Sequence, residues 1–127
     1  IFKQQQKAKF LDVKVVLTAG GTRVLFQTNI RNSETSKEAL YLNSTVSATN
    51  IESGVMVHNT KGHLSAEYLL PGTSVSVVGE MDFARLEDGV YKLLFQATSD
   101  EGGLSIGKEV NLVINRDIAQ KIKVVVN

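Results

Sequence analysis

Apolar and polar residues alternate along most of this chain, and the clearest run follows Gly89. Tyr91, Leu93 and Phe95 share one parity in this run, and Gly102-Gly103 closes it. A period of two places alternate side chains on one face of a β-strand, and glycines at both ends are typical of hairpin turns. The run therefore predicts a strand with one buried face, and nothing in it resembles an active site.

The same alternation recurs in several other stretches, separated by turn signals about 8–12 residues apart. One of these stretches contains Gly79, which indicates a bulge or bend. No helical period is sustained, so the chain is predicted to be all-β, an immunoglobulin-like antiparallel β-sandwich of seven to eight strands. The parity of the strands predicts a core that includes Phe26, Ile30, Val46, Val77, Tyr91, Leu93, Phe95, Val110 and Leu112.

A chain of 127 residues is long enough for one domain with a sizeable core. Residues 1–8 are expected to be a linker or the end of a preceding domain, and residues 9–116 the sandwich. Residues 117–127 are expected to be an exit segment towards a further C-terminal region, with one helical turn in it. Because the chain begins at Ile1 without a basic and apolar leader, we expect it to be part of a longer protein.

Charge and composition exclude several classes of partner. Lys and Arg number 14 against 13 Asp and Glu, with the signs interspersed, so no basic field would attract nucleic acid. No apolar run approaches the roughly 20 residues that span a bilayer, so membrane attachment is expected only through flanking segments. Cysteine is absent, which removes disulfides and thiol chemistry and leaves the cellular compartment open.

No set of residues has the spacing of a catalytic or metal-binding site. His58 and His63 are the only histidines, have only Glu67 nearby as a carboxylate, and are expected to be exposed loop residues. There is no Gly-x-Ser-x-Gly elbow, and the glycine pairs lie between strands rather than before a helix, where a phosphate cradle would need them. We therefore expect no enzyme activity, no catalytic residue, no metal, no cofactor and no small-molecule substrate.

The middle of the chain alternates less regularly and is the candidate binding region. Side chains that a core does not claim can face a partner, and Tyr and Met are enriched in interfaces. A short edge strand can also accept a partner strand through its backbone. The competing interpretation is a poorly patterned edge without a binding role. The candidate contact residues are Tyr41, Val55, Met56, Val57 and Tyr68.

Four short motifs occur in an order that resembles a known family. They are Ile30-Arg31-Asn32, Pro71-Gly72-Thr73, Gly89-Val90-Tyr91-Lys92-Leu93 and Ala119-Gln120-Lys121-Ile122. From about Leu11 to Asn127 the chain is similar to the C-terminal, host-binding extracellular domain of WxL-interacting cell-surface proteins of Gram-positive bacteria. The family often has Ala-Pro-Asn-Ser where this chain has Leu70-Pro71-Gly72-Thr73, so a generic bacterial immunoglobulin-like module is the alternative.

The resemblance implies a non-enzymatic adhesion domain that is extracellular and associated with the cell surface or cell wall. It would lie between a peptidoglycan-binding domain and a membrane anchor. Its protein partner would be a WxL-domain protein or a host extracellular-matrix protein. Two other functions stay open: a structural spacer of a larger surface protein, and an accessory domain beside a catalytic domain. A contiguous exposed apolar patch would favour a binding module over a spacer.

Overall fold

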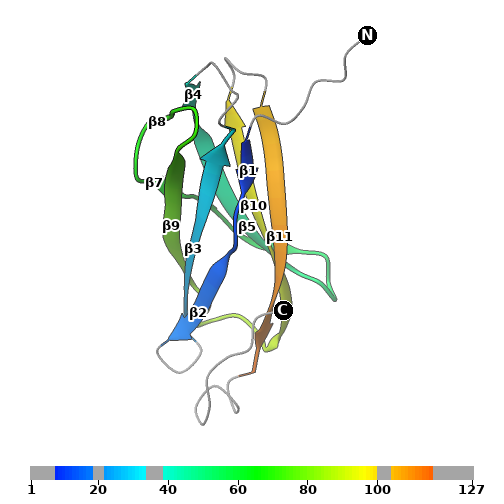
Figure 1. Ribbon diagram of the computed structural model, residues 1–127. Coiled ribbons are helices and arrows are strands. Elements are labelled where there is room, and N and C mark those ends of the chain that lie inside the picture. The colour runs from blue at the N-terminus through cyan, green and yellow to red at the C-terminus, as the bar shows by residue number, and fades with distance from the viewer. Residues whose placement is uncertain (1–7, 19–21, 34–38, 100–103, 116–127) are drawn as a thin grey trace.

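The computed structural model describes residues 8–18, 22–33, 39–99 and 104–115, and these residues form antiparallel strands and turns without a helix (Figure 1). In chain order the strands are β1 (Ala8–Phe10), β2 (Lys14–Thr18), β3 (Arg23–Asn32), β4 (Leu40–Tyr41), β5 (Asn43–Asn50), β6 (Met56–Lys61), β7 (His63–Leu64), β8 (Tyr68–Leu69), β9 (Ser74–Asp82), β10 (Gly89–Ser99) and β11 (Leu104–Ile114). The all-β class that the alternation predicts is confirmed. The helical turn expected in the exit segment lies outside the described residues.

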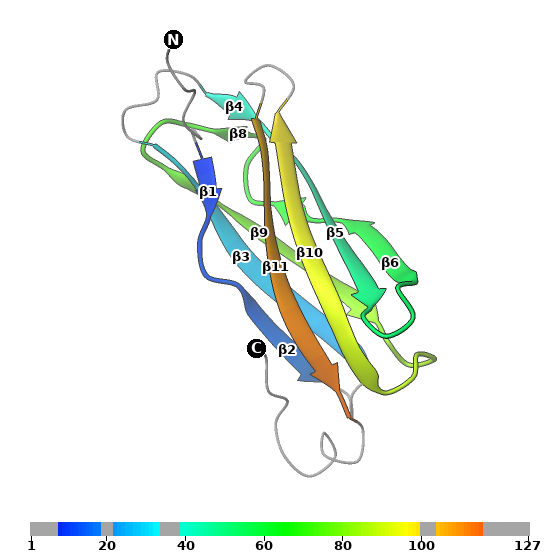
Figure 2. The ribbon, with the colours of Figure 1, turned by 90° about the vertical axis from the view of Figure 1, so that its right-hand side faces the viewer.

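The strands form three sheets. The first has the order β1-β3-β9-β7, with β2 also paired to β3, and the second has the order β11-β10-β5-β6. The third is the two-stranded pair β4-β8. Figure 2 shows the two larger sheets as two layers, with β11 and β10 crossing in front of β3 and β9. All pairings are antiparallel, as expected for a chain without βαβ units.

The described residues contain eleven strands, more than the seven or eight predicted, partly because one edge strand is broken. Both β1 and β2 pair with β3, β1 near its C-terminal end and β2 near its N-terminal end. The Thr28 hydroxyl lies 3.2 Å from the carbonyl oxygens of Leu11 and Asp12 at the break. The buried hydroxyl thus supplies a hydrogen-bond donor to carbonyl groups that no longer pair with a neighbouring strand. The alternation of the sequence does not reveal this break. Ala8, expected in the linker, is already a buried residue of β1.

The core lies between the two larger sheets and contains side chains from both. Phe95 of β10 is fully buried, and its ring meets Phe10 and Phe26 edge-on at centroid distances of 6.4 and 5.4 Å. Eight of the nine predicted core residues are buried. The exception is Val110, which is half-buried and packs against the core. It lies on β11, which has a strand neighbour on one side only, so fewer side chains cover it.

Strand β9 runs through Gly79 without a break in register, so the predicted bulge at this glycine is wrong. Gly79 pairs with Phe26, and a Cβ on Gly79 would lie 2.4 Å from Cζ of the Phe26 ring. The glycine leaves room for an aromatic ring rather than bending the strand. The register shift occurs instead between β5 and β6, where Ala48 pairs with His58 and Thr49 pairs with Met56.

The chain changes sheet at Gly62. Strand β6 ends at Lys61 in the second sheet, and β7 begins at His63 in the first. The Gly62 amide donates to the carbonyl oxygen of Ser44 at 3.1 Å. A Cβ on Gly62 would lie 2.5 Å from Cγ1 of Val77 and 3.0 Å from the Ser44 hydroxyl oxygen. Only glycine therefore fits at this crossing without displacing core side chains.

A tyrosine fixes the turn that leads into β10. The Tyr91 hydroxyl donates to the carbonyl oxygen of Glu87, four residues earlier, at 2.6 Å. Its ring is buried and meets the ring of Phe83 edge-on at 5.1 Å. The side chain thereby holds the β9–β10 connection against the core.

Removing this hydroxyl should destabilise the domain without disturbing its packing. Tyr91→Phe keeps the ring and loses one part-buried hydrogen bond, so we expect a loss of about 0.5–1.5 kcal/mol in unfolding free energy. Urea denaturation measures this loss directly. Tyr41→Phe, on an exposed tyrosine, is the control and should change the free energy by less. An equal change in the two variants would contradict a role for the Tyr91 bond.

Candidate functional site

The structure divides the five candidate contact residues between two places. Tyr41 of β4 and Tyr68 of β8 are direct cross-strand partners in the small third sheet. Their rings lie 5.3 Å apart in an edge-to-face arrangement and are 42% and 48% exposed. We call these two residues the tyrosine pair. Although they are 27 positions apart in the sequence, the β4–β8 pairing makes them one aromatic surface.

The tyrosine pair rests on a rigid base. Leu40 and Leu69, the other residues of β4 and β8, are fully buried in a second cluster of core residues. The buried Asn32 side-chain amide donates to the carbonyl oxygen of Leu69 at 3.1 Å. Alternation along each two-residue strand then turns the tyrosines outward. The third sheet therefore anchors to the core on one side and presents two aromatic rings on the other.

The segment after the tyrosine pair adds an apolar side chain to this end of the molecule. Leu70 is 53% exposed and precedes the turn at Pro71 and Gly72. The hydroxyl of Thr73 donates to the Leu70 carbonyl oxygen at 2.7 Å, and the Gly72 amide donates to the carbonyl oxygen of Ser33 at 3.2 Å. These bonds hold the turn in one conformation, so Leu70 is presented on an ordered loop.

Val55 and Met56 lie at the turn between β5 and β6 and are each 56% exposed. Tyr41 precedes β5, whereas Met56 pairs with Thr49 near the end of that strand. Eight residues of extended chain at about 3.3 Å each separate these positions by roughly 26 Å. The structure therefore does not bring Val55 and Met56 close to the tyrosine pair.

Val57 is not an exposed contact residue. It is half-buried and packs against the main core, because the register shift between β5 and β6 makes it the extra residue opposite Ala48 and Thr49. Two further exposed apolar side chains lie near the β5–β6 turn, Ile51 and Val90, and sequence reasoning missed both. The Ile51 amide donates to the carbonyl oxygen of Val90 at 3.0 Å, so they are neighbours. In the sequence, Val90 has the parity opposite to Tyr91, which places it on the outer face.

The two histidines do not form a site. His58 is half-buried in β6, with its ring 5.4 Å from that of Phe83 and its Nε2 2.6 Å from the carbonyl oxygen of Asp82. A carbonyl only accepts, so Nε2 carries the proton in this bond. The expectation of an exposed loop residue is thus wrong for His58, whereas His63 is exposed in β7 of the other sheet.

Within the described ranges, no group of three or more His, Cys, Asp or Glu side chains is placed to hold a metal ion. The same part of the chain offers no helix of the length and apolarity needed to cross a bilayer. No protein-family model matches the chain, and no curated protein sequence matches it. The tyrosine pair with Leu70, and the β5–β6 turn, are the candidate surfaces that the geometry supports.

Proposed function

We propose that this chain is a non-enzymatic binding module of the cell surface, that its fold is immunoglobulin-like, and that the tyrosine pair contacts a protein partner. The observation that carries the proposal is the third sheet. It has two strands of two residues, with one residue of each strand fully buried and the other an exposed tyrosine. A spacer has no need of such an arrangement.

The strand order supports the immunoglobulin-like fold. In immunoglobulin domains one sheet has the order A-B-E-D and the other contains C, F and G. In the first sheet of this chain, β1 and β2 together correspond to A, β3 to B, β9 to E and β7 to D. In the second sheet, β5 corresponds to C, β10 to F and β11 to G, and β6 is an additional edge strand. The Tyr91 hydrogen bond also fits the tyrosine corner, in which a tyrosine near the start of strand F bonds to backbone a few residues upstream. The ring contact of Phe26 and Phe95 joins β3 and β10, which correspond to strands B and F, the pair that a disulfide links in antibody domains.

The chemistry of the tyrosine pair suits a protein ligand. Tyrosine offers a large apolar ring and a hydroxyl with few rotatable bonds, and it is over-represented among residues that dominate binding energy. The edge-to-face geometry forms a ridge rather than a flat platform, so it fits a concave protein surface better than the flat face of a sugar ring. From the family resemblance, the proposed partner is a WxL-domain protein or a host extracellular-matrix protein.

Single replacements in the tyrosine pair test the proposal. Tyr41→Ser and Tyr68→Ser should each weaken binding to an immobilised WxL-domain protein or matrix protein by at least about tenfold, since hot-spot truncation costs more than about 1.4 kcal/mol. Both side chains are exposed, so melting temperatures should change little. Surface plasmon resonance on a panel of WxL-domain and matrix proteins measures the affinity.

Met56→Ser is the matched control, because Met56 is also exposed and pairs with Thr49 near the other end of β5. It should bind as the parent does. Loss of binding in Met56→Ser with full binding in both tyrosine variants would move the interface to the β5–β6 turn. Absence of binding to every member of the panel by the parent chain would favour the structural spacer.

A further inference from the structure

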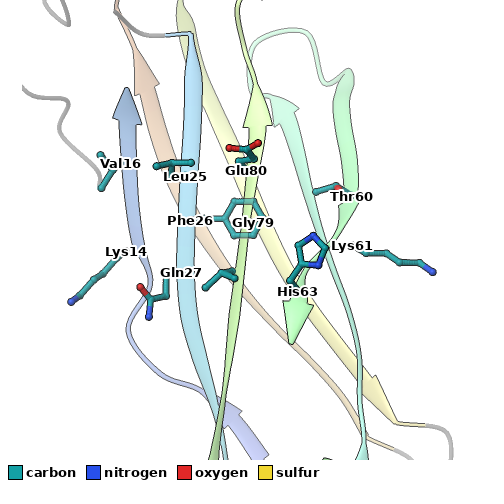
Figure 3. A pocket seen from close by; sticks show the side chains of 11 residues that line it. Lys14, Val16, Leu25, Phe26, Gln27, Thr60, Lys61, His63, Gly79 and Glu80 are labelled. Atoms are coloured by element: carbon teal, nitrogen blue, oxygen red, sulfur yellow. The ribbon is translucent and has the colours of Figure 1, made fainter. Parts of the chain in front are cut away.

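The outer face of the first sheet carries an open groove of about 620 Å³ (Figure 3), and its lining includes neither the tyrosine pair nor Val55 or Met56 of the β5–β6 turn. Its floor includes Val16 of β2, Leu25 of β3 and Val78 of β9, which are 54%, 40% and 41% exposed. Val16 and Leu25 are direct cross-strand partners. Three large apolar side chains on adjacent strands thus form a contiguous patch, which single exposed residues do not.

Cations flank this floor on both sides. In Figure 3, Lys14 lies on one side of the groove, and Lys61 lies on the other. In the described part of the chain neither lysine forms an ion pair. Among the described residues that line the groove, Glu80 is the only carboxylate, and its Oε1 lies 2.9 Å from Nη1 of Arg23, which neutralises it.

The pairing of the strands across the first sheet gives the width that a ligand in the groove has to span. Lys14, Gln27, Val78 and His63 are successive cross-strand partners on β2, β3, β9 and β7. Three steps between strands at about 4.8 Å each make a row of about 14 Å. An extended peptide advances about 3.3 Å per residue, so four or five residues cross the row. The Gln27 amide group lies in the middle of the row, where it can bond to a peptide backbone.

We propose that this groove binds an extended protein segment in which apolar side chains are flanked by carboxylates. The apolar residues cover Val16, Leu25 and Val78, and the carboxylates at the two ends meet Lys14 on one side and Lys61 on the other. The unpaired lysines select an acidic ligand, and the apolar floor selects against a uniformly charged one. The site is separate from the surface proposed above and does not depend on it.

The test uses the whole 127-residue chain and an array of hexapeptides that permutes Asp, Glu, Lys, Ser, Val and Leu. The strongest binders are expected to carry carboxylates on both sides of Val or Leu. Fluorescence polarisation with the strongest binder then measures affinity. The double variant Lys14→Glu with Lys61→Glu should bind it at least about tenfold more weakly and should prefer the lysine counterpart of the peptide. Val78→Ser should weaken the binding of both the acidic peptide and its lysine counterpart.

Two variants serve as controls. Lys92→Glu reverses a charge on the outer face of the second sheet, and Tyr41→Ser alters the tyrosine pair, so both should bind the acidic peptide as the parent does. Each variant is first shown to melt like the parent. The proposal is overturned if no peptide binds saturably, if basic or neutral peptides bind best, or if Lys92→Glu loses as much affinity as the double variant. Concentration-dependent dimerisation that Val78→Ser abolishes would assign the groove to a second copy of the chain instead.

Discussion

Phe95→Ala is expected to lower the free energy of unfolding by about 3–5 kcal/mol. Phe95 is fully buried, and its ring makes edge-on contacts with Phe10 of β1 and Phe26 of β3 across the interface between the two larger sheets. Truncation removes these contacts and leaves a cavity that neighbours on both sheets cannot fill without moving their strands. Urea denaturation monitored by circular dichroism gives the change, provided that the transition is two-state.

Val90→Ala is the control for this prediction, because Val90 lies on the same strand with its side chain exposed. Its effect should stay below about 1 kcal/mol, as for most exposed positions. A loss for Phe95→Ala no larger than that of Val90→Ala would mean that Phe95 does not lie on the buried face of β10.

Gly79→Ala is expected to destabilise the domain by about 1–3 kcal/mol or more, although alanine is only one methyl group larger. The added Cβ would lie 2.4 Å from Cζ and 2.8 Å from Cε1 of Phe26. The Phe26 ring cannot move away freely, because it is buried and lies against Phe95. Either the ring or the pairing of β3 with β9 must shift.

A double-mutant cycle separates this clash from a general intolerance of the strand. Phe26→Leu alone should destabilise by removing core contacts, but in the Gly79→Ala background it also removes the clash. The cost of the double variant should therefore be smaller than the sum of the two single costs. Additive costs would show that Phe26 is not what excludes a side chain at Gly79.

Much of the main sheets could be predicted from the period of two. Strands β3, β9 and β10 have one face buried and the other exposed over nine or more residues, so parity alone identifies Phe26, Val77 and Phe95 as core. The pairing of β5 with β10 also places Val46 opposite Phe95, on the buried face. Long strands carry enough alternating positions for the pattern to be unambiguous.

The details that shape the candidate sites depend on contacts distant in sequence. The pairing of Tyr41 with Tyr68 follows from two-residue strands, which are too short to show a period. The burial of Val57 depends on a register shift against β5, and the sequence of β6 contains no signal for it. Sequence reasoning found a binding region by its irregular pattern, but pattern alone could not show that the region occupies two ends of one strand.

The crossing at Gly62 makes β6 and β7 one continuous segment that belongs to both larger sheets. Because β6 is an edge strand of the second sheet and β7 an edge strand of the first, neither can detach from its sheet without pulling on the other sheet. The Gly62 amide and the carbonyl of Ser44 lie at the junction, so strain that enters through β7 reaches β5 directly. Under tension, the two layers should therefore part as one mechanical unit on this side rather than peel away strand by strand.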